Sequence, residues 1–196
     1  GSLPRVVDVV PAHWYNTIAF QATQMEHHRG VTILNKKVPE TIDNLPFLHI
    51  KEIRDRCNAV GGSLRKAIRL CKNVRADAES EGTDIPLPSF DIAATMYHAS
   101  MDALRIGAIY DLAILAEAQR HLDMLACNHE YAKNLLVPDG SRRIFNTQEK
   151  LIGLNRLSVE MDNLMRAVAK EQSAALATYN EPSLVECRRT LEYASL

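Results

Sequence analysis

No apolar run in this 196-residue sequence approaches the roughly 18 residues that a membrane-spanning helix needs, and no segment resembles a signal peptide. An excess of one charge is lacking too, because 23 lysine and arginine residues are offset by 24 aspartate and glutamate residues, for a formal net charge of −1. Bulk electrostatics therefore do not favour a polyanion as partner, and any basic site must be local. We expect a cytoplasmic protein without a membrane partner.

Cysteine is sparse, and its positions lack the spacing of a metal site. Cys57, Cys71, Cys127 and Cys187 form no Cys-x-x-Cys pair and have no histidine at ligand spacing. This pattern is typical of reduced cytosolic thiols and argues against a structural zinc site.

Residues 3–45 carry strand signals. A β-branched run at Arg5–Val10 is closed by Pro11, and two further apolar segments follow at Tyr15–Thr23 and Gly30–Asn35. Three short strands bury little core by themselves. We therefore predict that they are the end of a sheet rather than a complete one.

Residues 46–79 predict helices. Pro46 opens one helical segment, and Gly61-Gly62-Ser63 supplies a break and an N-cap for the next. That second helix has an apolar stripe at steps of three and four, made of Leu64, Ala67, Ile68, Cys71 and Val74. Five cations fill its other positions: Arg65, Lys66, Arg69, Lys72 and Arg75. The pattern predicts an amphipathic helix with an unusually basic polar side.

Residues 80–86 predict a polar loop, and residues 87–196 predict a helical bundle. Ser89 is expected to cap a helix that runs to Tyr97, followed by a long apolar segment at Ala99–Cys127. A turn at Val137–Gly140 precedes an amphipathic helix over about Thr147–Ala177, and a short helix ends the chain. The expected fold class is α+β, mostly α.

Asp8 is a candidate metal ligand. It lies in the apolar sequence RVVDVVPA, where a strand buried on both faces would have to bury a carboxylate. A divalent metal ion is the common partner that offsets such a desolvation. The alternative is an aspartate at a strand end whose side chain faces solvent. A magnesium site for phosphoryl chemistry needs two or three carboxylates, so the partners of Asp8 would have to lie upstream.

Arg65, Arg69 and Lys72 are candidates for anion binding. Steps of four and three place them on one face of the predicted helix, where three cations repel one another unless an anion offsets them. A polyphosphate fits this chemistry, since arginine binds it in a bidentate manner and lysine acts as a point charge. The alternative is a solvated basic surface.

Other charged positions give weaker signals. His13 and the pair His27-His28 are expected to be loop histidines, because adjacent histidines on a strand point to opposite sides and cannot share an ion. Arg142-Arg143, after the turn, are expected to be surface residues rather than a site.

Four motifs taken in order resemble the later part of polymerase-β-type nucleotidyltransferases. They are RVVDVVPA around Asp8, LPFLHI at Leu45–Ile50, LRKAIRLCKN at Leu64–Asn73 and LPSFDIAA at Leu87–Ala94. The resemblance runs from Arg5 to about residue 170 and is closest to the branch that holds the oligoadenylate synthetases and the bacterial cyclic-oligonucleotide synthases of antiphage defence.

The resemblance implies a nucleotidyltransferase that joins nucleoside triphosphates through two Mg²⁺ ions and makes a cyclic or linear oligonucleotide messenger. Asp8 would be the third catalytic, metal-binding carboxylate, and Arg69 and Lys72, with Arg65 beside them, would bind the nucleotide. Residues 3–45 would be the last strands of the catalytic core, 46–79 the connecting helices and 87–196 the C-terminal helical domain.

Two departures from the family limit these expectations. The Gly-Ser loop and the Asp-x-Asp pair of the family are absent, so we expect part of a longer enzyme that is inactive by itself. Asn73 stands where the synthetases prefer histidine or an aromatic residue, which leaves the base preference open. The competing interpretation is a non-enzymatic helical module whose basic helix binds RNA or a protein partner, such as an activating protein.

Overall fold

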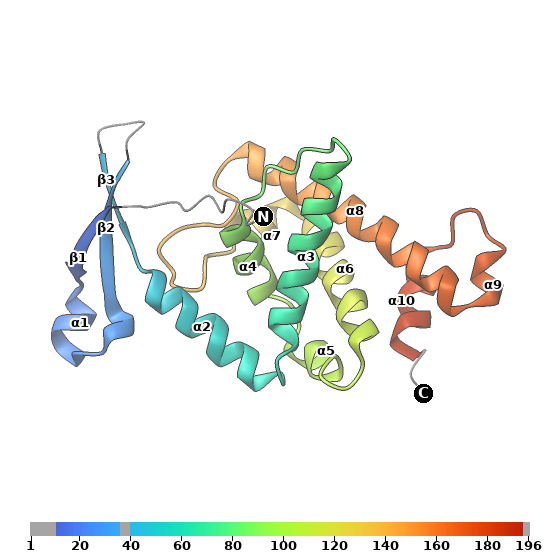
Figure 1. Ribbon diagram of the computed structural model, residues 1–196, viewed down its shortest axis with the longest axis horizontal. Coiled ribbons are helices and arrows are strands. Elements are labelled where there is room, and N and C mark those ends of the chain that lie inside the picture. The colour runs from blue at the N-terminus through green and yellow to red at the C-terminus, as the bar shows by residue number, and fades with distance from the viewer. Residues whose placement is uncertain (1–10, 36–39, 194–196) are drawn as a thin grey trace, which may run out of the picture. The chain divides into compact units, whose positions relative to one another are not determined.

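The computed structural model describes residues 11–35 and 40–193, which divide into two compact units, one up to Glu52 and one from Ile53 onward (Figure 1). The first unit holds an antiparallel sheet in the order β1-β2-β3, formed by Ala12–Asn16, Arg29–Asn35 and Glu40–Asn44. In its register Trp14 lies opposite Val31, and Thr32 lies opposite Asp43. The predicted strand at Arg5–Val10, with Asp8, lies outside the described residues.

The segment predicted as a strand at Tyr15–Thr23 is mostly helical, so that prediction was wrong. β1 ends at Asn16, and helix α1 covers Ile18–Thr23, followed by the 3-10 helix η1 at Glu26–His28. The cause is Thr17, whose side chain accepts a hydrogen bond from the Phe20 amide and caps the helix. Thr17 also donates to the carbonyl oxygen of His28 at 2.7 Å, which closes the connection back to β2.

The strand predicted at Gly30–Asn35 is confirmed as the main part of β2, whereas β3 was not predicted. β3 has the sequence Glu-Thr-Ile-Asp-Asn, with one apolar residue, Ile42, that is half exposed. Such a polar edge strand carries almost no hydrophobic signal. Gly30 is required on β2, because a Cβ atom there would lie 2.9 Å from the carbonyl oxygen of Asn44 and from a ring carbon of Tyr15.

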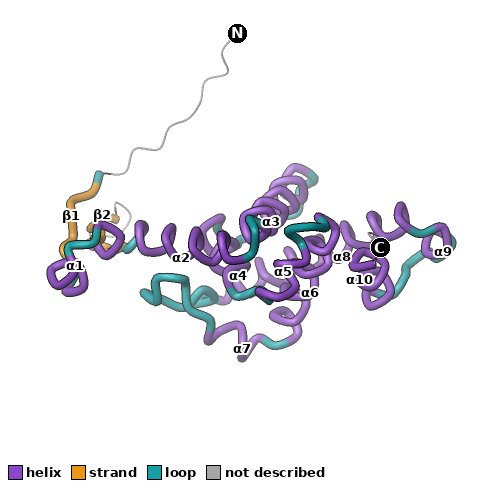
Figure 2. The backbone as a smooth tube through the Cα atoms, turned by 90° about the horizontal axis from the view of Figure 1, so that it is seen from below, coloured by secondary structure: helices purple, strands orange, loops and turns teal. Residues whose placement is uncertain are grey.

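Helix α2 (Pro46–Ala59) begins at Pro46, as predicted, and reaches into the second unit. The second unit is helical, and Figure 2 shows its helices joined by loops. Its further helices are α3 (Ser63–Ser80), α4 (Ser89–Tyr97), α5 (Met101–Ile106), α6 (Asp111–Cys127), α7 (His129–Asn134), α8 (Gln148–Gln172), α9 (Ala174–Ala177) and α10 (Leu184–Tyr193). The predicted fold class, α+β and mostly α, is confirmed.

The core of the second unit lies where α3, α6, α8 and α10 pack against one another. Its largest fully buried side chains are aliphatic or methionine, among them Leu64, Met96, Leu122, Leu154 and Met161. The apolar stripe predicted for residues 64–74 is buried along its whole length, which confirms the amphipathic helix α3.

The break and N-cap predicted at Gly61-Gly62-Ser63 are confirmed, because Gly62, with φ of 93°, is the N-cap of α3. The cap predicted at Ser89 was wrong, because Pro88 precedes α4 and Ser89 is its first residue. The apolar segment Ala99–Cys127 is helical, as expected for the bundle, and it forms two helices, α5 and α6, because the chain turns after Gly107. The helix predicted over about Thr147–Ala177 begins as α8 after Thr147, which caps it and accepts a hydrogen bond from the Lys150 amide.

Candidate functional site

Helix α3 presents its cations on the side opposite its buried stripe. Leu64, Ala67, Ile68 and Cys71 face the core, whereas Arg65 and Arg69 are exposed and Lys72 is half buried. The spacing of four and three therefore brings the three predicted binding residues to one accessible face. We call Arg65, Arg69 and Lys72 the basic face of α3.

The three residues of the basic face have no protein partner within the described part of the chain. Within residues 11–35 and 40–193, the side chains of Arg65, Arg69 and Lys72 make no hydrogen bond or ion pair. The other two cations of α3 behave differently. Lys66 pairs with Asp111 at 2.7 Å, and Arg75 pairs with Glu79 at 2.7 Å while donating to the carbonyl oxygen of Leu87 at 2.9 Å.

The helix thus uses two of its five cations for the fold and leaves three available for an external anion. Repulsion alone does not demand a ligand, because like charges one helical turn apart at a surface cost only about 0.2–0.5 kcal/mol per pair. Their chemistry is more informative. Two guanidinium groups and one ammonium group supply forked and point-charge donors, which together suit the several oxygens of a triphosphate.

The buried side of α3 is chemically inert. Burial raises the pKa of the Cys71 thiol to about 12, so this thiol stays protonated and is no nucleophile at neutral pH. The structure records the four cysteines as free. The accessible chemistry of α3 therefore lies on the basic face.

A buried ion-pair network around Asp91 was not predicted. Asp91, in the first turn of α4, is 1% exposed and accepts from Arg142 at 2.6 Å and from Lys150 at 2.9 Å. Arg142 also lies over the ring of Phe90, 5.3 Å from its centroid. The Arg142 side chain is 35% exposed and Arg143 is exposed, so both reach the surface as predicted, but the pairing of Arg142 with a buried carboxylate was not foreseen. The available signal was the single carboxylate in the apolar run SFDIAATM.

A second polar group, formed by Arg56, His98 and His121, stabilises the helices around α4. Arg56 donates to the Ala99 carbonyl oxygen at 3.0 Å, and the imidazoles bond to carbonyl oxygens of Leu136 and Thr95 at 2.7 and 3.0 Å. The pKa of His121 is lowered to about 4, mainly by burial; the hydrogen bond to Thr95 opposes this shift, and the charge of Arg120 contributes to it. Burial lowers the pKa of His98 as well. Both rings are therefore neutral at pH 7.

The metal site expected at Asp8 has no counterpart elsewhere in the described ranges. Among residues 11–35 and 40–193, no group of three or more His, Cys, Asp or Glu side chains is placed to hold a metal ion. His13 lies on β1 and not in a loop, and the rings of His27 and His28 on η1 meet edge to face with centroids 4.3 Å apart. These two histidines were expected in a loop and lie instead on a 3-10 helix. No helix in the described part of the chain combines the length and apolar character needed to span a bilayer.

Comparison with known families identifies the family to which the helical part of the chain is similar. Residues 51–168 match the model of the cGAS/DncV-like nucleotidyltransferase C-terminal helical domain. The chain belongs to this family. The resemblance to cyclic-oligonucleotide synthases that the four motifs suggested is thereby confirmed.

Individual relatives agree with the family. The chain is 44% identical over 171 residues to the cyclic dinucleotide synthase CdnE of Yersinia aleksiciae, covering 87% of this chain and 45% of that protein. It is 29% identical over 164 residues to a c-di-GMP synthase of Flavobacteriaceae sp. genome_bin_11, covering 82% and 44%. A solved structure, the STING-associated CdnE c-di-GMP synthase from Capnocytophaga granulosa, superposes with a TM-score of 0.66 at 29% identity and covers 79% of this chain and 48% of that one.

The chain spans about half the length of the curated relatives it matches. The part matched by the cGAS/DncV-like family model contains the whole basic face of α3 and the Asp91 network. Asp8 lies before residue 51 and outside the matched range. The roles of Asp8, Arg65, Arg69 and Lys72 remain predictions.

Proposed function

We propose that this chain is the C-terminal part of a nucleotidyltransferase that makes a cyclic dinucleotide from nucleoside triphosphates, and that the basic face of α3 binds the triphosphate. The observation that carries the proposal is the division of the α3 cations. Lys66 and Arg75 are paired within the fold, whereas Arg65, Arg69 and Lys72 have no partner in the described ranges. The names of the relatives, CdnE and c-di-GMP synthase, support the product class.

The proposed role of this face is to bind and orient. Arg69 and Lys72 hold the β- and γ-phosphates, and Arg65 adds attraction one turn earlier on the helix. Packing of the α3 stripe against the core keeps the backbone of these residues in place. The Arg75 bond to the Leu87 carbonyl oxygen ties α3 to the loop before α4, where the motif LPSFDIAA begins.

Mg²⁺ is the cofactor that the nucleotidyltransferase proposal implies. When bound, it would neutralise phosphate charge and activate the attacking hydroxyl. Asp8 is the residue of this chain proposed as its ligand, on the resemblance of RVVDVVPA alone. One carboxylate does not make a two-metal site, so we propose that this chain by itself does not catalyse the transfer.

The first test of the proposal is titration of the chain with GTP and with ATP. We expect weak binding, and we expect Arg69→Ala to weaken it about tenfold or more, because a hydrogen bond to a charged group contributes about 1.5–3 kcal/mol. Arg189→Ala is the matched control, since Arg189 is an exposed arginine on α10. Equal loss in both variants would contradict a specific role for Arg69. Binding of RNA that Arg69→Ala abolishes, without any binding of GTP or ATP, would support the helical interaction module instead.

The second test concerns activity. The chain incubated with GTP, ATP and Mg²⁺ is expected to give no cyclic or linear product by chromatography. Product formation by the chain alone would contradict the proposed inactivity, while leaving the phosphate-binding role of α3 to be judged by the titration.

A further inference from the structure

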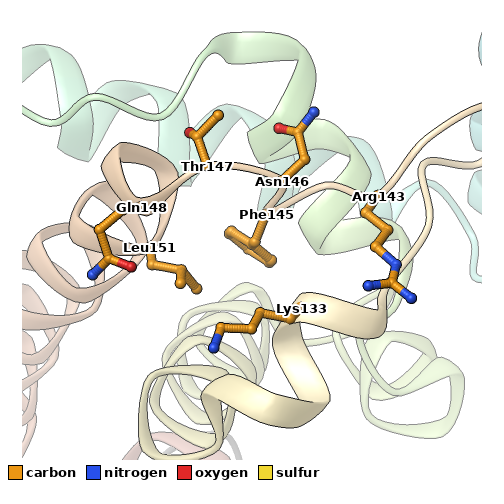
Figure 3. A pocket seen from close by; sticks show the side chains of 7 residues that line it. All are labelled: Lys133, Arg143, Phe145, Asn146, Thr147, Gln148 and Leu151. Carbon is orange, nitrogen blue, oxygen red and sulfur yellow. The ribbon is translucent and has the colours of Figure 1, made fainter.

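A pocket of about 320 Å³ lies in the second unit between α7, the loop before α8 and the first turns of α8 (Figure 3). Its cationic side chains are Lys133 on α7 and Arg143 in the loop, and its polar amides are Asn146 and Gln148. Phe145 and Leu151, each 3% exposed, form an apolar floor. Figure 3 shows Lys133 and Arg143 coming from different elements, with the Lys133 ammonium group on the side of Leu151 and Gln148 and the Arg143 guanidinium group on the opposite side of the pocket. None of these residues belongs to the basic face of α3.

The loop that carries Arg143 is fixed on both sides. Leu136 and Arg143 form an isolated antiparallel bridge, and the Ile144 amide donates to the Leu135 carbonyl oxygen at 2.9 Å. The neighbouring Arg142 is held by the buried Asp91, which also pairs with Lys150 on α8. One buried carboxylate therefore ties the loop to the helix that forms the other wall of the pocket. The site is preorganised rather than assembled by a free surface loop.

The two cations are available to a ligand. Within the described residues, the Arg143 side chain makes no hydrogen bond or ion pair. Lys133 pairs with Glu130 at 2.9 Å, but that carboxylate is 85% exposed, and an exposed ion pair within one helical turn contributes little free energy. An anion in the pocket can replace this pair at small cost. The balance of charge among the lining side chains is +2, from Lys133 and Arg143.

The lining favours an anion with an apolar body. Lys133 and Arg143 supply point-charge and forked donors, as phosphate oxygens require. Gln148 is the first residue of α8, and the amides of Gln148 and Glu149 lack partners within the helix, whereas the Lys150 amide donates to the Thr147 cap. The Phe145 ring and the Leu151 methyl groups of the floor suit an organic substituent. The volume lies at the lower end for small-molecule sites, which limits the ligand to about the size of a mononucleotide.

We propose that this pocket binds a small phosphate monoester, with the phosphate between Lys133 and Arg143 and the organic part over Phe145 and Leu151. Its residues come from α7, from the loop between α7 and α8, and from α8 itself. The proposal therefore does not depend on nucleotide binding by α3. The site adds a second anion-binding position to the helical domain, where an organic phosphate can stabilise the packing of α7 against α8.

Calorimetric titration of the chain with AMP and with inorganic phosphate tests this site. AMP is expected to bind more tightly than phosphate, because only AMP covers the apolar floor. Arg143→Gln and Lys133→Gln should each weaken AMP binding about tenfold, by loss of a charged hydrogen bond. Arg189→Gln, which removes an exposed arginine of α10, should leave binding unchanged. Circular dichroism of each variant confirms that it is folded.

Two results would overturn the pocket proposal. One is the absence of binding by either probe at millimolar concentration, and the other is AMP binding that neither Arg143→Gln nor Lys133→Gln changes. Equal affinity for phosphate and AMP would contradict the role of the floor. An Arg69→Ala variant separates the two sites, since it should weaken GTP binding at α3 and leave the effect of Arg143→Gln on AMP intact.

Discussion

Single residues of this chain were predictable where their role depends on local spacing. Arg65, Arg69 and Lys72 share a helical face because of the step between them, and the structure places them at accessible positions on α3. Asp91 was missed because its partners, Arg142 and Lys150, follow it by more than 50 residues in the chain. No local pattern in a sequence shows such a pairing.

The Asp91 network gives a prediction for stability. Asp91→Ala leaves Lys150, whose side chain is 15% exposed, without its carboxylate, and we expect a loss of about 3 kcal/mol in the free energy of unfolding. The control is Asp102→Ala, which removes an exposed carboxylate and should cost less than about 1 kcal/mol. Asp102 pairs with Arg105 at 2.6 Å, the same distance as between Asp91 and Arg142. Urea unfolding measures both. Similar losses of stability in the two variants would show that the burial of Asp91 does not increase its contribution to the free energy of unfolding.

The buried histidine predicts a dependence on pH. The folded pKa of His121 is about 4, below the ordinary 6.5, so the unfolded chain binds more protons between these values. His121 therefore contributes fully above pH 6.5, and stability falls as pH decreases toward 4, by at most about 3 kcal/mol. Burial also lowers the pKa of His98, so this histidine likewise makes the chain less stable as the pH falls.

Urea unfolding at several pH values, compared with His121→Gln, isolates this contribution. The variant is expected to lose less stability between pH 6.5 and 4 than the native chain, because it lacks the buried imidazole. An identical decrease in the two proteins would contradict the assignment.

Among the structural elements, the strongest sequence periodicity gave the most accurate prediction. α3 was predicted from its stripe, and all five predicted stripe residues are buried. α1 and β3 were missed for opposite reasons, since Thr17 converts an apolar segment into a short helix and β3 has little apolar content. The ends of helices were less predictable than their faces, because a serine near a helix start can be either its cap or its first residue.

The helix ends supply a matched pair of variants. Thr147→Ala removes the cap of α8, the longest described helix, and should cost about 1 kcal/mol. Ser63→Ala removes a buried hydroxyl that has no hydrogen-bond partner among the described residues, and should cost nothing measurable or stabilise the chain. Thermal unfolding distinguishes them, and a greater loss for Ser63→Ala would contradict the cap assignments.

At the scale of the whole molecule, membership of the cGAS/DncV-like helical domain family follows from residues 51–168. The fold class was predictable because the helical zone is long and periodic. The pocket between α7 and α8 was not predictable, since Lys133 and Gln148 are brought together by the intervening loop. The first unit exposes Trp14, Ile18 and Leu34, so its three strands have little core of their own. That they are the end of a larger sheet stays a prediction.

The central claim is that the basic face of α3 recognises the phosphates of a nucleotide. The most direct measurement compares the affinities of the chain for GTP and for guanosine, in the native sequence and in a variant with Arg65→Gln, Arg69→Gln and Lys72→Gln together. The account predicts that the native chain prefers GTP and that the triple variant loses this preference while its affinity for guanosine is unchanged. A preference for GTP that survives in the triple variant would contradict it.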